Sequence, residues 1–152
     1  MPYTIETNAK NRGKQMKLVY EFELEPRLCI NANKMSEGMN PKCFQKNRYG
    51  IWGAFLSMKQ EIQKLANAWI DENKPAPFEG EVKETFYVGN LRPSMNYDPV
   101  NYHPIEKACV DVFVKRGVLE DDNSLIIPSV TFKPLEKVPR KKYKFVLEFE
   151  KI

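Results

Sequence analysis

Four short segments of the chain have residue patterns that predict β-strands, and alternation of apolar and polar residues indicates a strand with one buried face. In the clearest segment, residues 18–25, aromatic and leucine side chains alternate with glutamates, and Pro26 follows directly. The others are residues 81–88, 125–132 and 143–150. Because proline cannot donate a ladder hydrogen bond, Pro128 predicts that the third strand lies at an edge of the sheet.

Two further segments have apolar residues at three- and four-residue steps, which is typical of amphipathic helices. In residues 50–72 the apolar positions are Phe55, Met58, Ile62, Leu65 and Trp69. The second helix is predicted over residues 104–116, because proline suits a first helical turn and Gly117 suits a helix end. Its buried face comprises Ile105, Ala108, Cys109, Val112 and Phe113.

The order of these elements is strand, helix, strand, helix, strand, strand. It predicts an α/β (α+β) fold with a mixed sheet of about four strands and two main helices packed on it. We expect a single domain over residues 17–152. Residues 1–16 are polar and show no period, which predicts a flexible basic arm.

The composition is that of an ordinary folded protein, with 42% apolar residues. No stretch is apolar enough to span a membrane, and the N-terminus lacks the apolar centre of a secretory signal. Three cysteines without a CxxC pair, and a single histidine, argue against a disulfide framework and against a zinc site. A cytoplasmic protein without a membrane partner is the expectation.

Basic residues are concentrated in a few segments, although the net charge is only +4. Basic segments with aromatic neighbours suit a polyanion, because neutralising phosphates releases counterions. A solvated, solubilising surface would have the same pattern, so both interpretations stay open. The candidate DNA-contacting residues in these segments are Lys34, Lys42, Lys46, Arg48, Arg140, Lys141 and Lys142.

Acidic residues flank the second predicted helix, with Asp98 before it and the pair Asp121 and Asp122 after it. If the fold brings both ends together, these carboxylates suit a Mg²⁺ ion for phosphodiester hydrolysis, since Mg²⁺ prefers oxygen ligands. A nearby lysine would neutralise the charge that develops on the phosphate. The structural alternative is simpler, because Asp-Asp-Asn after a glycine is also common turn chemistry.

The segment over residues 98–123 resembles the signature of the RusA-type Holliday-junction resolvases. That signature has Asp-x-Asp-Asn, then Lys, Asp and Gly, and finally Asp-Asp. The spacing agrees without a gap from Lys107 to Asp122. Elsewhere the resemblance is limited to the order of elements. The matching residues are Asp98, Asn101, Lys107, Asp111, Gly117, Asp121 and Asp122.

The resemblance implies a RusA-like fold and a homodimer that cuts branched DNA with Mg²⁺, or with Mn²⁺ as a substitute. Such enzymes are often encoded by phages and prophages. By residue, it implies that Asp98, Lys107 and Asp122 are catalytic. It also implies that Lys133 corresponds to a basic residue in the strand after the Asp-Asp pair. The implied metal ligands are Asp98, Asn101, Asp121 and Asp122.

One residue departs from the signature: Val100 stands where the family has its second Asp, and extra residues follow Asn101. Asn101 or Glu106 is then a replacement oxygen donor. A catalytically impaired member that binds DNA or another protein is the alternative that Val100 favours. The third interpretation is an unrelated small α/β binding module whose acidic turn is incidental.

Overall fold

The computed structural model describes residues 15–31, 44–89, 98–135 and 142–152, with only the backbone described for residues 44–52. Strands, α-helices and short 3-10 helices follow one another along these residues. In chain order they are β1 (Lys17–Leu24), η1 (Pro26–Leu28), α3 (Phe44–Asn73), β2 (Val82–Gly89), η2 (Pro99–Tyr102), α4 (His103–Lys115), β3 (Ser129–Pro134) and β4 (Tyr143–Lys151).

The four strands form one mixed sheet in the order β1-β4-β2-β3. β4 runs antiparallel to both β1 and β2, whereas β2 and β3 are parallel neighbours. Parallel neighbours need a crossover connection, and α4 lies within it. The predicted fold class is therefore confirmed, and so is the edge position of the third strand.

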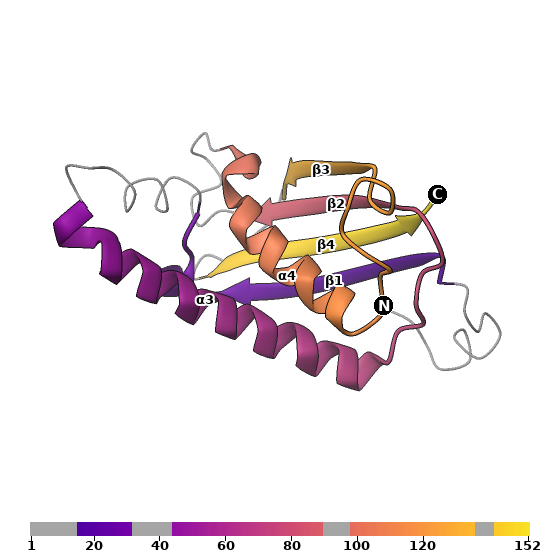
Figure 1. Cartoon of the computed structure of the whole chain (residues 1–152), viewed down its shortest axis with the longest axis horizontal. Coiled ribbons are helices and arrows are strands. Elements are labelled where there is room, and N and C mark those ends of the chain that lie inside the picture. Colours follow the sequence, from indigo (N-terminus) through magenta and orange to yellow (C-terminus); the bar gives the residue numbers. More distant parts are fainter. Residues whose placement is uncertain (1–14, 32–43, 90–97, 136–141) are drawn as a thin grey trace.

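Both helices cover the same face of the sheet, as Figure 1 shows. The alternation predicted for the first strand is present, because Leu18, Tyr20, Phe22 and Leu24 are all buried. The first three are the register partners of Phe149, Leu147 and Phe145 of β4, which are buried on the same inner face. The core therefore lies between the sheet and the two helices.

Aromatic rings tie the helices to this inner face. Phe113 of α4 is fully buried, and its ring centroid lies 5.6 Å from that of Tyr20 and 5.7 Å from that of Phe149. Trp69 of α3 lies 6.1 Å from Phe113 and 5.2 Å from Tyr20. The predicted buried face of α4 is confirmed, because all five of its residues are buried.

The third strand begins later than predicted, at Ser129 instead of residue 125. The Asn123 side chain accepts hydrogen bonds from the backbone N–H groups of Leu125 (2.9 Å) and Ile126 (3.3 Å). Such side-chain bonds compete with strand pairing and hold a turn. Residues 124–126 therefore form a turn that precedes the strand.

The predicted arm, residues 1–16, lies outside the described residues except for its last two. Gln15 is buried, and its backbone N–H donates to Pro77 O at 3.3 Å. The carbonyl of Met16 accepts from Lys151 N at 2.8 Å. These two residues therefore belong to the folded domain.

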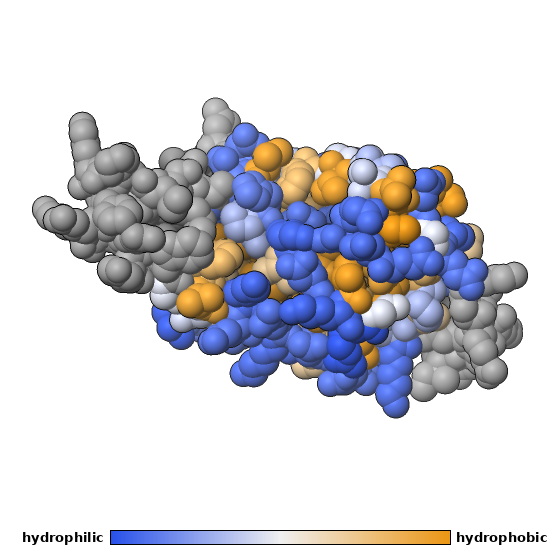
Figure 2. Space-filling view, viewed as in Figure 1, coloured by the Kyte–Doolittle hydropathy of each residue, from blue (hydrophilic) through white to orange (hydrophobic). Residues whose placement is uncertain are grey.

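Hydrophilic residues cover much of the helix side of the molecule, with apolar residues in separate groups between them (Figure 2). Within the described part of the chain, no helix combines the length and apolar character needed to cross a membrane.

We predict that Phe113→Ala destabilises the protein by about 3–5 kcal/mol, because it removes a buried ring and leaves a cavity among three aromatic neighbours. The free energy of urea unfolding is the measurement. Leu56→Ala is the control on α3, where the leucine is 53% exposed. Equal losses for the two variants would contradict the assigned core.

Candidate functional site

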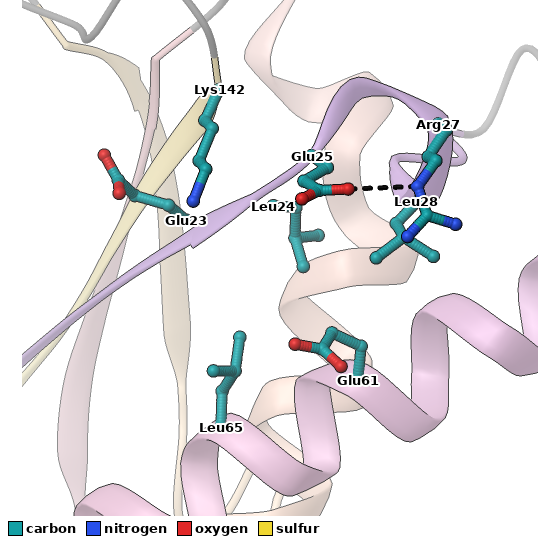
Figure 3. Close-up of a pocket in the computed structure, with 8 residues that line it drawn as sticks. All are labelled: Glu23, Leu24, Glu25, Arg27, Leu28, Glu61, Leu65 and Lys142. Atoms are coloured by element: carbon teal, nitrogen blue, oxygen red, sulfur yellow. Dashed lines mark hydrogen bonds and ion pairs between the residues drawn. The ribbon is translucent and has the colours of Figure 1, made fainter.

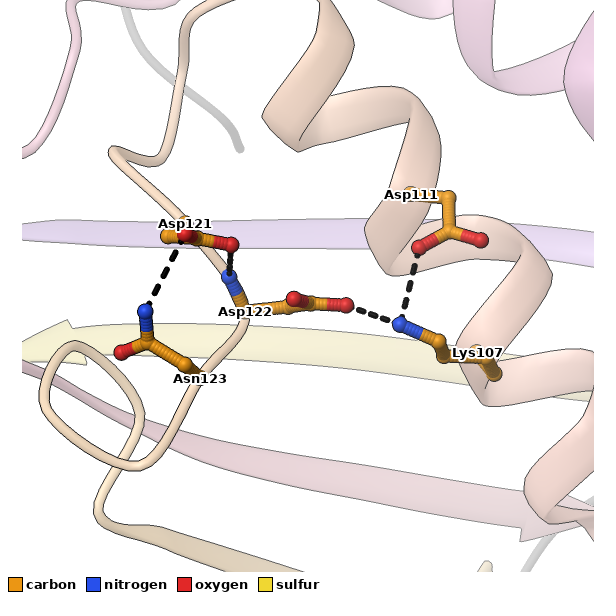
Figure 4. Close-up of polar contacts among 5 residues, drawn as sticks. All are labelled: Lys107, Asp111, Asp121, Asp122 and Asn123. Carbon is orange, nitrogen blue, oxygen red and sulfur yellow. Dashed lines mark hydrogen bonds and ion pairs between the residues drawn. The ribbon is translucent and has the colours of Figure 1, made fainter.

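Lys107 lies on the second turn of α4 and joins two of the predicted site residues. Its Nζ lies 3.0 Å from Asp111 Oδ1, one helical turn further on. It also donates to Asp122 Oδ2, 15 residues along the chain (Figure 4). The bond to Asp122 raises the pKa of Lys107 to about 12, with a further contribution from Asp111. The pKa of Asp122 is lowered in turn, mainly by its bond to Lys107.

The loop that carries Asp122 is anchored at both ends. Gly117 ends α4 with a φ of 78°, a conformation that glycine adopts without strain. The N–H of Val118 then bonds to Phe113 O at 2.9 Å, as in a Schellman cap. Val118 O accepts from Phe78 N at 2.8 Å, and at the far end Ile126 O accepts from Val82 N at 2.7 Å. These bonds hold the loop beside α4.

Asp121 has a structural task within this loop. Its Oδ1 accepts from the backbone N–H of Asp122 at 2.7 Å, and its Oδ2 accepts from Asn123 Nδ2 at 3.1 Å. Both carboxylate oxygens therefore stabilise the turn, which is the structural alternative that the sequence left open. Asp122, whose own side chain points to Lys107, is the member of the pair that faces the helix (Figure 4).

Glu84 of β2 is a buried carboxyl group close to this cluster. It is 0% exposed, and neither carboxyl oxygen meets hydrogen-bond geometry with any described residue. The pKa of Glu84 is raised to about 10, first by burial and then by the adjacent Glu106 carboxyl group and the charge of Asp122. At neutral pH the Glu84 side chain is therefore uncharged.

Glu106 precedes Lys107 on α4 and is half-buried. Its pKa is also raised, first by burial, while the Lys107 ammonium opposes this effect. The Lys107 ammonium acts to lower the pKa of all three carboxyl groups, Glu84, Glu106 and Asp122, and the other two both act to raise that of Glu84. Close carboxyl groups disfavour simultaneous ionisation unless a cation balances them.

The structure does not join the first part of the signature to this cluster. The Oδ1 of Asp98 accepts from Val100 N at 3.1 Å, and Asp98 O accepts from Asn101 N at 3.0 Å. Asp98 therefore caps its own short 3-10 helix, η2. Among the described residues, no three or more His, Cys, Asp or Glu side chains form a group that could hold a metal ion. The ligand set implied by the resemblance stays a prediction.

Few of the predicted DNA-contacting side chains can be placed. Lys133 on β3 and Lys142 are exposed. Lys46 and Arg48 lie on the part of α3 for which only the backbone is described. Lys34, Lys42, Arg140 and Lys141 lie outside the described residues. The predicted nucleic-acid surface therefore stays a prediction too.

A pocket of about 220 Å³ lies between the end of β1, η1 and α3 (Figure 3). Its polar lining is mixed in charge, and within it Glu25 pairs with Arg27 at 3.0 Å. None of its lining residues belongs to the Lys107 cluster. They are Glu23, Leu24, Glu25, Arg27, Leu28, Glu61, Leu65 and Lys142.

Glu84 was not among the predicted site residues, although the sequence contains a signal for it. Along β2 the buried side chains of Val82, Phe86 and Val88 lie two or four residues from Glu84. Side chains two apart share a face of the sheet, so Glu84 occupies an inward position. A carboxyl group on the buried face of a strand is rare in proteins. Such a residue is therefore a candidate for a functional role.

No protein-family model matches this sequence, and no curated protein matches it significantly.

We predict opposite effects for two glycine-to-alanine changes. Gly117→Ala costs about 1 kcal/mol of stability, because alanine is strained at positive φ. Gly53→Ala stabilises by about 0.5–1 kcal/mol, because alanine is the better helix former and the added Cβ would meet no atom within 4 Å. Thermal unfolding checks both, and a stabilising Gly117→Ala would contradict the assigned helix end.

We predict that stability falls as pH rises from 6 to 8. The unfolded chain loses the Glu84 proton near the ordinary pKa of 4.5, whereas the folded chain keeps it up to about pH 10. Folding therefore takes up a proton in this range, and stability decreases by up to about 1.4 kcal/mol per pH unit.

Glu84→Gln removes this proton uptake, so the variant should be more stable than the wild type at pH 8, by an amount that grows with pH. Urea unfolding at several pH values is the measurement. Glu120→Gln, an exposed change on the Asp122 loop, is the control. Parallel pH profiles for the wild type and Glu84→Gln would show that Glu84 is not the group responsible.

Proposed function

We propose that the protein is a metal-dependent endonuclease that hydrolyses phosphodiester bonds in branched DNA such as Holliday junctions. The proposal includes a homodimer, because two matched cuts in a two-fold symmetric junction require two matched sites. A cytoplasmic, phage- or prophage-encoded setting accords with the family that the sequence resembles. Mg²⁺ is the proposed cofactor.

The observation that carries this proposal is the contact between Lys107 and Asp122. These residues are 15 positions apart in the sequence. Their match to the family signature was the only feature of the sequence that assigned them to one site. The Lys107 side chain is 58% exposed and that of Asp122 is 27% exposed, so both remain accessible to a substrate. An accessible pair of this kind accords with a role at a reaction centre.

The chemistry assigns a role to each partner. Lys107 remains a cation at physiological pH because its pKa is raised, so its ammonium can neutralise charge that develops on a phosphoryl oxygen. Asp122 orients that ammonium and remains ionised because its pKa is lowered. Mg²⁺, when bound, would polarise the phosphate and lower the pKa of a coordinated water.

Binding of branched DNA without cleavage is the second candidate function. Val100, which replaces a family carboxylate, is 51% exposed and cannot bind a cation. Asp98 already accepts a backbone hydrogen bond within its own loop. Both observations favour a member in which the signature metal site is weakened.

A synthetic four-way junction with Mg²⁺ at fixed ionic strength tests the proposal. We predict symmetric cuts by the wild type. Asp122→Asn and Lys107→Met should each lower the cutting rate by about 100-fold or more, since each removes a charge from the reaction centre.

Lys115→Met is the matched control, because Lys115 is an exposed lysine at the end of the same helix. It should cut at close to the wild-type rate. An unchanged rate in Asp122→Asn would contradict the site assignment. Tight junction binding by the wild type without any cutting would favour the second candidate.

A further inference from the structure

The outer edge of β3 carries backbone groups that pair with none of the described residues. β3 is the last strand in the sheet order and pairs with β2 on one side only (Figure 1). The N–H of Leu135, directly after β3, donates to Val88 O of β2. Successive N–H groups of a strand point to opposite sides, so those of Val130 and Phe132 point away from β2. Such unpaired groups at a sheet edge can accept another strand.

Two prolines restrict which strand can pair there. Pro134 occupies the next outward position of β3, and Pro128 occupies the outward position before Val130. Proline has no N–H to donate to a ladder. Val130 and Phe132 are therefore the only residues of β3 with a donor on this edge. A partner strand must match these two residues, which few registers allow.

Apolar side chains are exposed along the same edge. Val130 is in register with Glu84, on the helix side of the sheet, and is 41% exposed. Val100, on the short helix η2 that contacts β3, is also exposed, as is Leu125 in the turn before β3. β3 itself has no acidic residue. The edge therefore presents apolar surface beside its unpaired backbone groups, as an interaction site does.

One antiparallel register makes β3 complementary to a second copy of itself. With Thr131 opposite Thr131 of the partner subunit, Val130 lies opposite Phe132 of the partner subunit, and their N–H and C=O groups face each other. Aromatic residues opposite β-branched residues, and threonine opposite threonine, are favourable cross-strand pairs. Ser129 lies opposite Lys133 of the partner subunit, so no like charges meet.

Neighbouring registers satisfy fewer of these groups. A shift of one residue would set the outward groups of one strand against the inward groups of the other. A shift of two residues would set a proline opposite Val130 or Phe132 and remove a donor. The self-complementary register is thus the one in which both donors of each strand are used.

We propose that the β3 edge is a homodimer interface in which two β3 strands pair antiparallel with Thr131 at the two-fold axis. The two four-stranded sheets would join into one continuous sheet. The contact is isologous, so it closes without forming a filament. Since this axis is perpendicular to the sheet, the helices and the Lys107–Asp122 pairs of both subunits would lie on the same face.

This inference deepens the proposed function, and it rests on that function for the use of two matched sites in one junction. The interface itself can be tested without DNA.

A register-specific disulfide tests the interface. Thr131→Cys would place two thiols across the axis, where opposite Cβ atoms are about 4.5–5.5 Å apart. Ser129→Cys is the matched control on the same face of β3, because its two thiols would be roughly 13 Å apart along the strands. Both changes are made in Cys43→Ser protein, since Cys43 is the one cysteine outside the described residues.

Under mild oxidation, we expect Thr131→Cys to form disulfide-linked dimers at least about tenfold faster than Ser129→Cys, because a disulfide requires closely spaced Cβ atoms. Non-reducing gel electrophoresis is the measurement.

Sedimentation velocity provides a second test. The Val130 N–H points away from β2, so proline at this edge position should leave the subunit folded, which near-ultraviolet circular dichroism checks. We expect a dimer for the wild type and a monomer for Val130→Pro at the same protein concentration. Val130→Ala, which keeps the N–H, should weaken the dimer less.

Three results would overturn the proposal: equal cross-linking of Thr131→Cys and Ser129→Cys, a wild type that stays monomeric at high micromolar concentration, or an unchanged dimer in folded Val130→Pro. Failure of the proposed function would differ, because the Thr131→Cys disulfide would still form while the four-way junction remained uncut with Mg²⁺.

Discussion

A carboxyl group at an inward position of the sheet is the constraint on which the rest of this structure depends. Glu84 lies on β2, between β4 and the edge strand β3, and its side chain is fully buried. An ionised carboxylate in such a place costs several kcal/mol unless it is paired. The protein meets this cost by keeping Glu84 neutral beside Glu106, with the ammonium of Lys107 nearby. The polar cluster is therefore one electrostatic unit extending from the core to the surface.

The crossover between the parallel strands β2 and β3 builds this unit. The described part of this crossover runs from η2 through α4 and returns along the loop of Asp122. The helix carries Glu106 and Lys107, and the anchored loop brings Asp122 to them. A single supersecondary unit thus supplies the strand, the helix and the loop of the candidate site. The other main elements, β1, β4 and α3, pack against this unit. The apolar side of α4, centred on Phe113, fixes the height of its polar side above the sheet.

Much of the fold could be predicted from the sequence because its signals are local. Residue patterns located β1, β2 and β4 within about one residue, and Gly117 marked the end of α4. The start of β3 was predicted too early because the Asn123 side chain holds a turn before the strand. The order of apolar and polar residues does not predict such side-chain hydrogen bonds. The beginning of α3 was also placed too late, at residue 50 instead of Phe44.

The candidate site was less accessible to sequence reasoning. The pair between Lys107 and Asp111 follows from helical spacing, whereas the contact between Lys107 and Asp122 depends on how the loop folds back. Asp98 matched the signature, but its carboxylate caps a local turn. Glu84 was missed because its meaning depends on which face of β2 the helices cover. That information comes from long-range packing.

The state of the Glu84 side chain in the cation-free protein tests the account most directly. Carbon-13 NMR of the glutamate carboxyl groups, assigned with Glu84→Gln, follows its ionisation as pH is varied. The account predicts that the Glu84 resonance keeps the chemical shift of a protonated carboxyl from pH 5 to pH 8. A resonance that titrates with a midpoint near the ordinary glutamate value of 4.5 would contradict the burial of Glu84 on which the account depends.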